Sequence, residues 1–299
     1  MKHILIVYHK NSGRGNSSRL AQKMRTYLEQ KKVVCMLYKS DSVENMQEFF
    51  CELKNKNYED LTIVMMGGDG TVGMGVDAII KSGVNAKIAV FNAGTVNDFG
   101  TYLKMPKKPK KYAEMLVLGK TKMCDVAKAN NTYFINVACG GYFTHGLNTY
   151  SRKDKKIFGK LAYWSKNIGV AFKMKPHKLF FSVDGKEFEE NLYFYLIVNS
   201  CSAGGFKHIG LDSEIDDGVF EFIGIKPAKL GKLAALFFKL IRGRHRGNGQ
   251  LVYHKGKHFC LKRDESDDHF KNVDTDGNRS EMFPLEIEVV SKKIELIIK

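Results

Sequence analysis

Several features are scarce or absent in this chain of 299 residues. Its six cysteines are scattered, without a C-x-x-C pair or the spacing of metal ligands, so neither a disulfide framework nor a structural zinc site is expected. No stretch approaches the roughly 18 apolar residues of a membrane-spanning helix, and the apolar run Ile4–Tyr8 is too short for the core of a signal peptide. We therefore expect a cytoplasmic protein, and peripheral attachment to the inner face of the membrane stays open.

Acidic residues are also few, with 32 Asp and Glu against 48 Lys and Arg. The formal net charge of +16 points to an anionic partner, and charge alone leaves a nucleotide, a nucleic acid and an acidic membrane surface open. We expect no nucleic-acid partner, because the chain lacks an aromatic-and-basic RNA motif and a recognition-helix signature. The length and the 43% of hydrophobic residues allow two domains, each with its own core.

One stretch combines an apolar run, a glycine loop and a helical pattern. The motif Gly67-Gly68-Asp69-Gly70-Thr71 follows the run Leu61–Met66. The apolar residues after it, at i, i+4, i+7 and i+8, are Val72, Val76, Ile79 and Ile80, which predicts an amphipathic helix. A glycine loop that feeds a helix offers backbone N–H groups to phosphate. The alternative, an Asp-Gly hairpin turn, is disfavoured because the flanks change from strand-like to helix-like.

Asp69 is an unusual residue in a phosphate-binding loop. Its carboxylate would be repelled by phosphate oxygens unless a divalent cation lay between them or it had a proton to accept. The loop therefore predicts phosphate chemistry as well as phosphate binding.

Two further polar loops follow predicted strands. Ile4–Tyr8 leads into a loop with Ser12, Gly13 and Arg14, and Ile88–Phe91 leads into a loop with Thr95, Asn97 and Asp98. Strands that alternate with helices predict a parallel sheet, and ligands of such sheets gather at the carboxyl ends of the strands. We expect the three loops to face one crevice, although the first one also reads as an ordinary polar connection.

Beyond residue 122 the predicted strands follow one another with short turns such as Asp184-Gly185, which is typical of an antiparallel sandwich. The strands are expected at 122–129, 132–138, 179–183, 193–199, 219–225, 258–262, 285–290 and 294–298. Two helices are expected, near 155–172 and 227–241. The second one is apolar and basic, so it either packs on the sandwich or lies on a membrane.

The expected fold is thus an α/β protein with an N-terminal parallel-sheet nucleotide-binding domain, residues 1–124, and a C-terminal β-rich antiparallel sandwich, residues 125–299. A return of the final residues to the first domain is left open. The lysine-rich segment 101–111 reads either as a solvated loop or as a contact for anionic headgroups.

Four motifs resemble the catalytic domain of the diacylglycerol kinase and sphingosine kinase superfamily, specifically its small soluble bacterial lipid kinases. They are G-G-D-G-T at 67–71, G-T-x-N-D-F at 94–99, G-x-L-A-Y at 159–163, and Gly204-Gly205-Phe206 followed by Asp217-Gly218. The related NAD kinases share the first motif, so NAD kinase is an alternative, but the second and third motifs separate the lipid kinases from them.

The resemblance implies ATP as phosphate donor, Mg²⁺ as cofactor and a lipid hydroxyl, such as that of diacylglycerol, as acceptor. The residues implied to hold nucleotide are Ser12, Gly13, Arg14, Gly67, Gly68, Asp69, Gly70, Thr71, Thr95 and Asn97. Those implied in catalysis and in binding magnesium are Asp69, Asp98 and Asp125, with Asp69 orienting or deprotonating the acceptor. Helix capping by Asp98 and a strand-end role for Asp125 are the plain alternatives.

The resemblance also implies that Asp217 binds a second, structural magnesium, against the simpler reading of a turn residue. The partner is expected to be a lipid substrate at an anionic membrane surface, and a homodimer is left open.

The chain departs from the family pattern at four places. The first loop keeps only Ser12-Gly13 of N-P-x-S-G, the N-E after the main loop is Gly73-Met74, and the proline of P-x-G-T is Asn92. The D-G-E motif, whose glutamate is a proposed base in some members, is Asp276-Gly277-Asn278. Because an amide cannot accept the proton, either Asp69 or Asp125 is the base, or the chain is a weak or inactive nucleotide- or lipid-binding homologue. The nearby Glu281 is not favoured.

Overall fold

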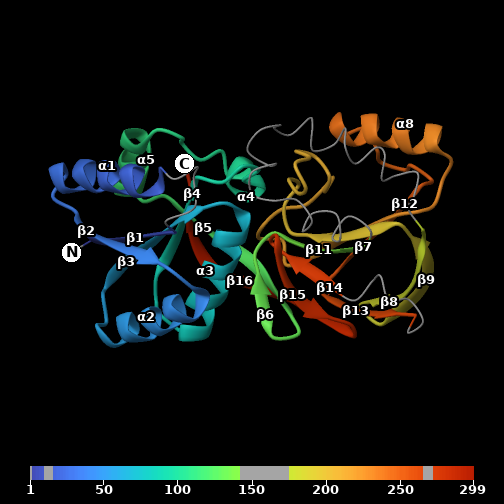
Figure 1. Ribbon diagram of the computed structural model, residues 1–299, viewed down its shortest axis with the longest axis horizontal. Helices are drawn as coiled ribbons and strands as arrows, with labels where there is room; N and C mark the ends of the chain where they lie inside the picture. Colours follow the sequence, from blue (N-terminus) through green and yellow to red (C-terminus); the bar gives the residue numbers. More distant parts are fainter. Residues whose placement is uncertain (1, 10–15, 142–174, 265–271) are drawn as a thin grey trace. The chain divides into compact units, whose positions relative to one another are not determined.

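The computed structural model describes residues 2–9, 16–141, 175–264 and 272–299. The chain divides into two compact units, which are described separately (Figure 1). Unit 1 contains Met1–Cys124 and Lys292–Lys299, and unit 2 contains Asp125–Ser291.

Unit 1 is built on a parallel sheet with the strand order β2-β1-β3-β4. These strands are β1 (Lys2–His9), β2 (Val34–Ser40), β3 (Asp60–Gly67) and β4 (Lys87–Asn92). β3 is buried from Leu61 to Gly67, as expected for a strand covered on both faces. Near the end of the chain Leu296 pairs in parallel with Ile88, so the last residues belong to this sheet.

Helices cover both faces of this sheet (Figure 1). They are α1 (Ser17–Gln30), α2 (Val43–Asn55), α3 (Asp69–Ser82), the short α4 (Asp98–Tyr102) and α5 (Pro109–Leu118). α1 and α5 pack together over Ile4, Ile6 and Val64, whereas α2 and α3 lie against the opposite face. Alternate residues of each strand therefore enter two different hydrophobic layers.

Unit 2 contains two antiparallel sheets. One has the order β12-β11-β10-β7-β14-β15, and in the other β16 pairs with β13, β13 with β8, and β8 with β9. The strands of the first are β7 (Val137–Gly141), β10 (Phe194–Val198), β11 (Phe220–Ile225), β12 (Leu251–Gly256), β14 (Asn272–Thr275) and β15 (Asn278–Met282). Those of the second are β8 (His177–Val183), β9 (Lys186–Leu192), β13 (His258–Arg263) and β16 (Leu285–Ile297). The hairpin of β5 (Thr121–Ala129) and β6 (Thr132–Phe134) precedes them in the chain.

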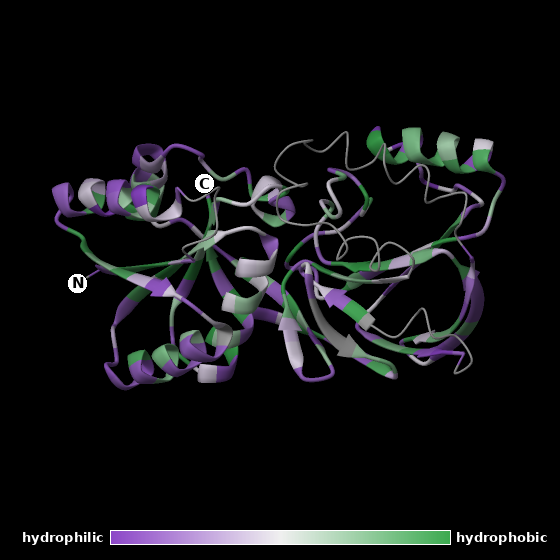
Figure 2. Cartoon of the chain, viewed as in Figure 1, coloured by the Kyte–Doolittle hydropathy of each residue, from purple (hydrophilic) through white to green (hydrophobic). Residues whose placement is uncertain are grey.

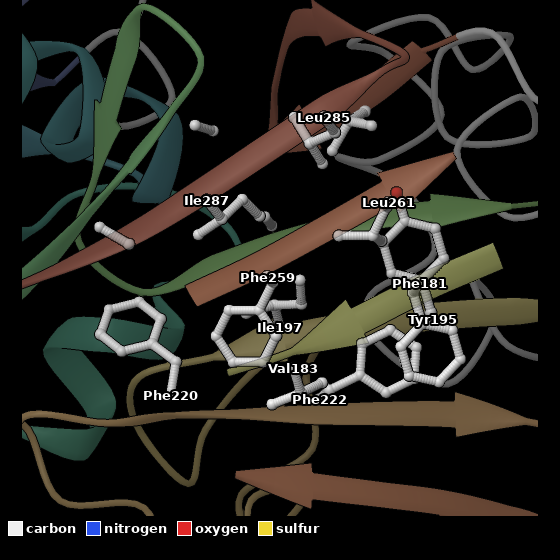
Figure 3. Close-up of a cluster of buried hydrophobic side chains, with 14 of the residues drawn as sticks. Phe181, Val183, Tyr195, Ile197, Phe220, Phe222, Phe259, Leu261, Leu285 and Ile287 are labelled. Atoms are coloured by element: carbon white, nitrogen blue, oxygen red, sulfur yellow. The ribbon is translucent and has the colours of Figure 1, made fainter. Parts of the chain in front are cut away.

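The core of unit 2 lies between the inner faces of these sheets and is rich in aromatic rings (Figure 3). Phe181 of β8 stacks on Phe222 of β11 with 4.3 Å between ring centroids, and Phe222 also stacks on Tyr195 of β10. Stacked pairs of this kind stabilise the sandwich beyond the burial of their area.

The helix α8 (Leu230–Ile241) covers part of the outer face of the six-stranded sheet (Figure 1). Leu236 and Leu240 are buried there, in a cluster with Leu196, Val198 and Ile223. Figure 2 shows that hydrophobic residues make up much of α8. Of the two sequence interpretations of this helix, packing on the sandwich is confirmed for one face.

The expected fold class, a parallel α/β sheet followed by an antiparallel β-rich part, is confirmed. Among the described residues the sequence interpretation missed β9, β12, β14 and β15, which are charged or short. It also expected two strands where β16 is one, because Ser291-Lys292-Lys293 resembles a turn; Lys292 instead adopts a positive φ of 50° within the strand. The helix expected at 155–172 lies outside the described residues.

The single strand expected at 132–138 is interrupted. Ile135 and Asn136 donate their backbone N–H groups to the carboxylate of Asp276 rather than to a neighbouring strand, so β6 ends at Phe134 and β7 begins at Val137. A side chain distant in sequence thus decides where these strands end.

Within the described parts of the chain, no helix has both the length and the apolar character needed to cross a membrane.

Candidate active site

The glycine loop ends β3 and begins α3. Gly68 is the N-cap residue, and its carbonyl accepts hydrogen bonds from the N–H groups of Thr71, at 3.0 Å, and Val72, at 3.1 Å. No side chain caps this end of α3, so the positive end of the helix dipole lies at the glycine loop. Such an end of a 14-residue helix suits an anionic ligand.

The second loop, between β4 and α4, is held by Asn97. Its side-chain oxygen accepts a hydrogen bond from Gly94 N and its side-chain nitrogen donates one to Gly94 O, each at 2.8 Å. Asn97 has a φ of 55°, a left-handed conformation that asparagine tolerates better than most residues. The residue therefore closes its own loop and precedes the first turn of α4.

The two loops approach so closely that Gly94 cannot carry a side chain at the point of contact. The N–H groups of Ala93 and Gly94 donate to the carbonyl of Gly67 at 2.9 and 3.1 Å. A Cβ on Gly94 would overlap the Cα of Gly68 and lie 2.7 Å from the Oδ1 of Asn97. A glycine at 94 is thus required by backbone contact between the loops, whereas a Cβ on Gly68 would make only a tight contact of 3.2 Å with the Cα of Gly94.

Asp69 joins the two loops through its carboxylate. Its Oδ1 accepts the backbone N–H of Phe99 at 3.2 Å. Burial raises the pKa of Asp69, while backbone N–H groups of Asp98 and its neighbours act in the opposite direction. The outcome is a half-buried carboxyl group at a helix N-terminus with a pKa above its ordinary value, a property typical of catalytic acids and bases.

The other unit 1 residues predicted for the site are placed as follows. Asp98 is buried at the start of α4, and Thr95 is exposed in the loop before it. Thr71 lies in the first turn of α3, where a Cβ on Gly67 would overlap its side chain. Asp69, Asn97 and Asp98 are therefore brought together, whereas Ser12, Gly13 and Arg14 lie outside the described residues.

Asp125 belongs to unit 2 and is fully buried there. Its Oδ2 accepts the N–H of Gly218 at 2.6 Å, its N–H donates to the carbonyl of Ile215, and its carbonyl accepts from the side chain of Asn199. The residue therefore ties β5 to the turn that precedes β11.

Asp217 is exposed in that same turn and accepts the N–H of Val219 at 3.1 Å. Burial raises its pKa, and the charges of Asp125 and Glu221 add to the effect. Within the described ranges no three His, Cys, Asp or Glu side chains form a cluster that could hold a metal ion. The geometry of Asp217 is that of a turn residue.

A buried polar network in unit 2 was missed by the sequence analysis. Asp276 accepts three backbone N–H groups, those of Ile135, Asn136 and Val137, at 2.8, 3.0 and 2.9 Å. The side chain of Asn136 binds Ser200 and the carbonyl of Ser202, and Asn199 bridges the carbonyls of Asp125 and Ile135. The sequence contains one signal for this network. An asparagine lies in or at the end of each of two predicted apolar strands, at 136 and at 199.

The network fixes the hairpin that carries the departure from the D-G-E motif. Asp276 and Gly277 form the turn between β14 and β15, with φ values of 51° and 85°, and Asn278 begins β15. The carboxylate of Asp276 is therefore a positioning group for Asn278.

Comparisons with known families match both parts of the chain. Residues 3–129 match the family described as "Diacylglycerol kinase catalytic domain", and residues 147–298 match the "YegS C-terminal NAD kinase beta sandwich-like domain". These matches span most of both units and agree with the sequence motifs at 67–71 and 94–99.

Individual relatives belong to the same family. A diacylglycerol kinase of Staphylococcus aureus (strain bovine RF122 / ET3-1) is 30% identical over 86% of this chain and 81% of its own length. A diacylglycerol kinase of Bacillus subtilis (strain 168) is 26% identical over 100% of this chain and 97% of its own. A crystal structure described as a diacylglycerol kinase from Bacillus anthracis str. Sterne covers 100% of this chain and 97% of its own, with a TM-score of 0.81 at 22% identity, and supports the fold. The chain belongs to the bacterial diacylglycerol kinase family, with the YegS-type C-terminal domain.

The contact between the two loops can be tested with Gly94→Ala. We expect the free energy of unfolding to fall by roughly 1–3 kcal/mol, because the new Cβ meets backbone and the loops must separate. Urea unfolding of Gly249→Ala is the control, since a Cβ at Gly249 would have no atom within 4 Å. Equal unfolding midpoints for Gly94→Ala and the unaltered protein would contradict the contact.

The role of Asp276 can be tested with Asp276→Asn. We expect a loss of about 2–4 kcal/mol in the free energy of unfolding, because an amide has one acceptor oxygen and turns its NH₂ group toward the N–H donors. Asp217→Asn provides a matched control at an exposed residue with one such bond, where the loss should stay below about 1 kcal/mol. Similar losses of unfolding free energy in the two variants would contradict the positioning role of Asp276.

Proposed function

We propose that the chain is an ATP-dependent lipid kinase that transfers the γ-phosphate to a hydroxyl group of a lipid such as diacylglycerol. The observation that carries the proposal is the Asp69 carboxyl group, held at the N-terminus of α3 by the loop that begins α4. Family membership supports ATP as the donor.

The phosphates are bound by backbone groups in this proposal. The loop 67–71 at the start of α3 holds the phosphates, with Ser12, Gly13 and Arg14 as further donors and Thr95 and Asn97 beside the nucleotide. Phosphoryl transfer requires alignment and stabilisation of charge on the transferred oxygens more than covalent chemistry by the protein. A rigid pair of glycine loops supplies the alignment.

Asp69 accepts the proton of the acceptor. The lipid oxygen forms a bond to the γ-phosphorus, the bond from that phosphorus to the oxygen of ADP breaks, and the hydroxyl proton passes to the carboxylate of Asp69. The raised pKa of Asp69 makes the carboxylate a better proton acceptor than an exposed aspartate. The N–H of Phe99 holds one oxygen and so orients the other.

Magnesium fits the residues present if it arrives with the nucleotide. The part of the chain that is described has no three-ligand cluster, and Mg²⁺ commonly uses one or two carboxylates, waters and substrate phosphates. Asp69 and Asp98 would hold this ion in unit 1, where it would neutralise charge on the phosphates. Asp217, in unit 2, would be a ligand of a second, structural magnesium.

The lipid acceptor places the proposed reaction at an anionic membrane surface on the cytoplasmic side. The net charge of +16 supports this location, because cationic proteins are attracted to acidic lipids. The charge does not select one acyl lipid over another, so the assay below uses several acceptors.

A second candidate function is nucleotide or lipid binding with weak or no turnover. It is favoured by one observation, the amide of Asn278 at the place where the family motif has a glutamate. The two functions differ in whether a phosphorylated lipid is released.

The Asp69→Asn variant tests the kinase function. With labelled ATP, magnesium and mixed micelles containing diacylglycerol, phosphatidylglycerol or a sphingoid base, we expect kcat to fall by about 10²- to 10⁴-fold. The affinity for ATP should change by less than about threefold, because the backbone binds the phosphates. Asp77→Asn is the matched control, since Asp77 lies on the same helix and pairs with Lys81 at 2.8 Å.

The pH profile gives an independent readout of Asp69. A base must be ionised, so activity is present above its pKa and lost as the pH falls through it, and burial moves that limb to higher pH than for an ordinary aspartate. Residual activity of Asp69→Asn should lack the limb. An unchanged rate and profile in this variant would overturn the role of Asp69.

Asn278→Glu distinguishes the two candidate functions. If Asp69 is the base, the added carboxylate should change kcat by less than about threefold, with Asn278→Gln as the uncharged control of similar size. A rise of tenfold or more in kcat for Asn278→Glu, but not for Asn278→Gln, would be the size of effect that a general base contributes. It would show that the natural chain is a weakened enzyme.

A further inference from the structure

Asn92 is a polar residue at the end of β4, where it pairs in register with Gly67 at the end of β3. Its side-chain oxygen Oδ1 is buried and forms no hydrogen bond within the described residues. The side chain therefore contributes to the fold of unit 1 through the space that it fills.

The side chain of Asn92 fills the space that a Cβ on Gly100 of α4 would need. Such a Cβ would overlap Oδ1 of Asn92 and lie 2.8 Å from its Nδ2. A half-turn of the amide group exchanges these two atoms, so it does not remove the overlap. Gly100 lies within α4 and has no left-handed φ. Space, rather than backbone conformation, therefore requires a glycine at this position.

Gly100 follows the residue whose backbone meets Asp69. The N–H of Phe99 donates to Oδ1 of Asp69 at 3.2 Å. Phe99 and Gly100 are adjacent residues of one helical turn, so a shift of Gly100 away from β4 would move the N–H of Phe99 as well. The separation of Asn92 and Gly100 therefore sets where this donor lies.

We propose that Asn92 and Gly100 form a matched pair that sets the distance between β4 and α4, and that Asn92 is thereby a positioning residue for the carboxylate of Asp69. Asn92 acts through Phe99. At its place the family pattern P-x-G-T has a proline, which carries no amide group, so the requirement for glycine at 100 comes from this chain's own asparagine. The inference deepens the proposed kinase function, on which it rests for the role of Asp69.

Hydrogen exchange of the Phe99 amide, followed by NMR in the full chain, tests the pair. In Gly100→Ala the amide should exchange about tenfold faster or more, because α4 moves away from β4 and the bond to Asp69 opens more often. In the double variant Asn92→Ala with Gly100→Ala, exchange should return to within about threefold of the unaltered protein. The added Cβ then enters the space that the amide group has left, so the two substitutions are not additive.

Turnover gives a second readout. In the assay with labelled ATP and diacylglycerol micelles, Gly100→Ala should lower kcat about 10- to 100-fold, because the proton acceptor is displaced. The KM for ATP should change by less than about threefold, since the glycine loop before α3 is unaltered. The double variant should regain kcat to within about threefold of the unaltered protein.

Matched substitutions elsewhere control for the two changes. Gly231→Ala adds a Cβ within the helix α8, where no atom lies within 4 Å of it. Asn55→Ala removes an exposed amide group at the end of α2. Both should leave the exchange of the Phe99 amide and kcat within about twofold of the unaltered protein.

Three results would overturn the proposal. One is exchange and turnover of Gly100→Ala equal to those of the controls, and another is a loss in Gly100→Ala that Asn92→Ala does not reverse. The third is faster exchange spread over β3 and β4 with a kcat that follows the folded fraction, because it would show a general loss of stability. If Gly100→Ala alone does not fold, a folded double variant supports the pair and an unfolded one overturns it.

The exchange measurement separates this inference from the kinase function, because it needs no turnover. Faster exchange in Gly100→Ala and its reversal in the double variant would support the pair even if no lipid were phosphorylated. Absence of lipid phosphorylation by the unaltered protein would then count against the kinase function alone.

Discussion

The close approach of two glycine backbones is the constraint on which the site in unit 1 depends. Gly68 and Gly94 come from loops after neighbouring strands, and their contact leaves no room for a Cβ on Gly94. Because the loops meet, the N–H of Phe99 reaches the carboxylate of Asp69, and the start of α4 is held against the start of α3. A parallel sheet brings such loops to one edge, and the glycines decide how close they come.

Unit 2 depends on a different interaction, in which side chains accept backbone hydrogen bonds that pairing between strands would otherwise satisfy. Asp276 receives three N–H groups that a continuous strand would have donated to its neighbour, and Asn136 and Asn199 satisfy the carbonyls nearby. A buried network is stable only when each member is paired, so these residues act as a set. The set holds the hairpin that carries Asn278. The asparagine that replaces the family's glutamate therefore stands on a hairpin that is fully hydrogen-bonded at its turn.

The donor side of the proposed reaction depends on backbone groups. The glycine loops offer backbone groups whose geometry does not depend on side-chain rotamers, and they suit an invariant donor such as ATP.

The sequence by itself determined the fold class, most strands and helices of unit 1, the glycine loop at 67–71 between a strand and a helix, and the family. These depend on local signals: apolar periodicity, glycine spacing and contiguous motifs. Only the tertiary structure decided that β6 ends at Phe134, that β16 is one strand, that Asp276 is a structural carboxylate and that the sandwich covers one face of α8. Each of these depends on a partner more than 60 residues away, as between Asp276 and Ile135, or on which helix face the sheet covers, and no local pattern records such contacts.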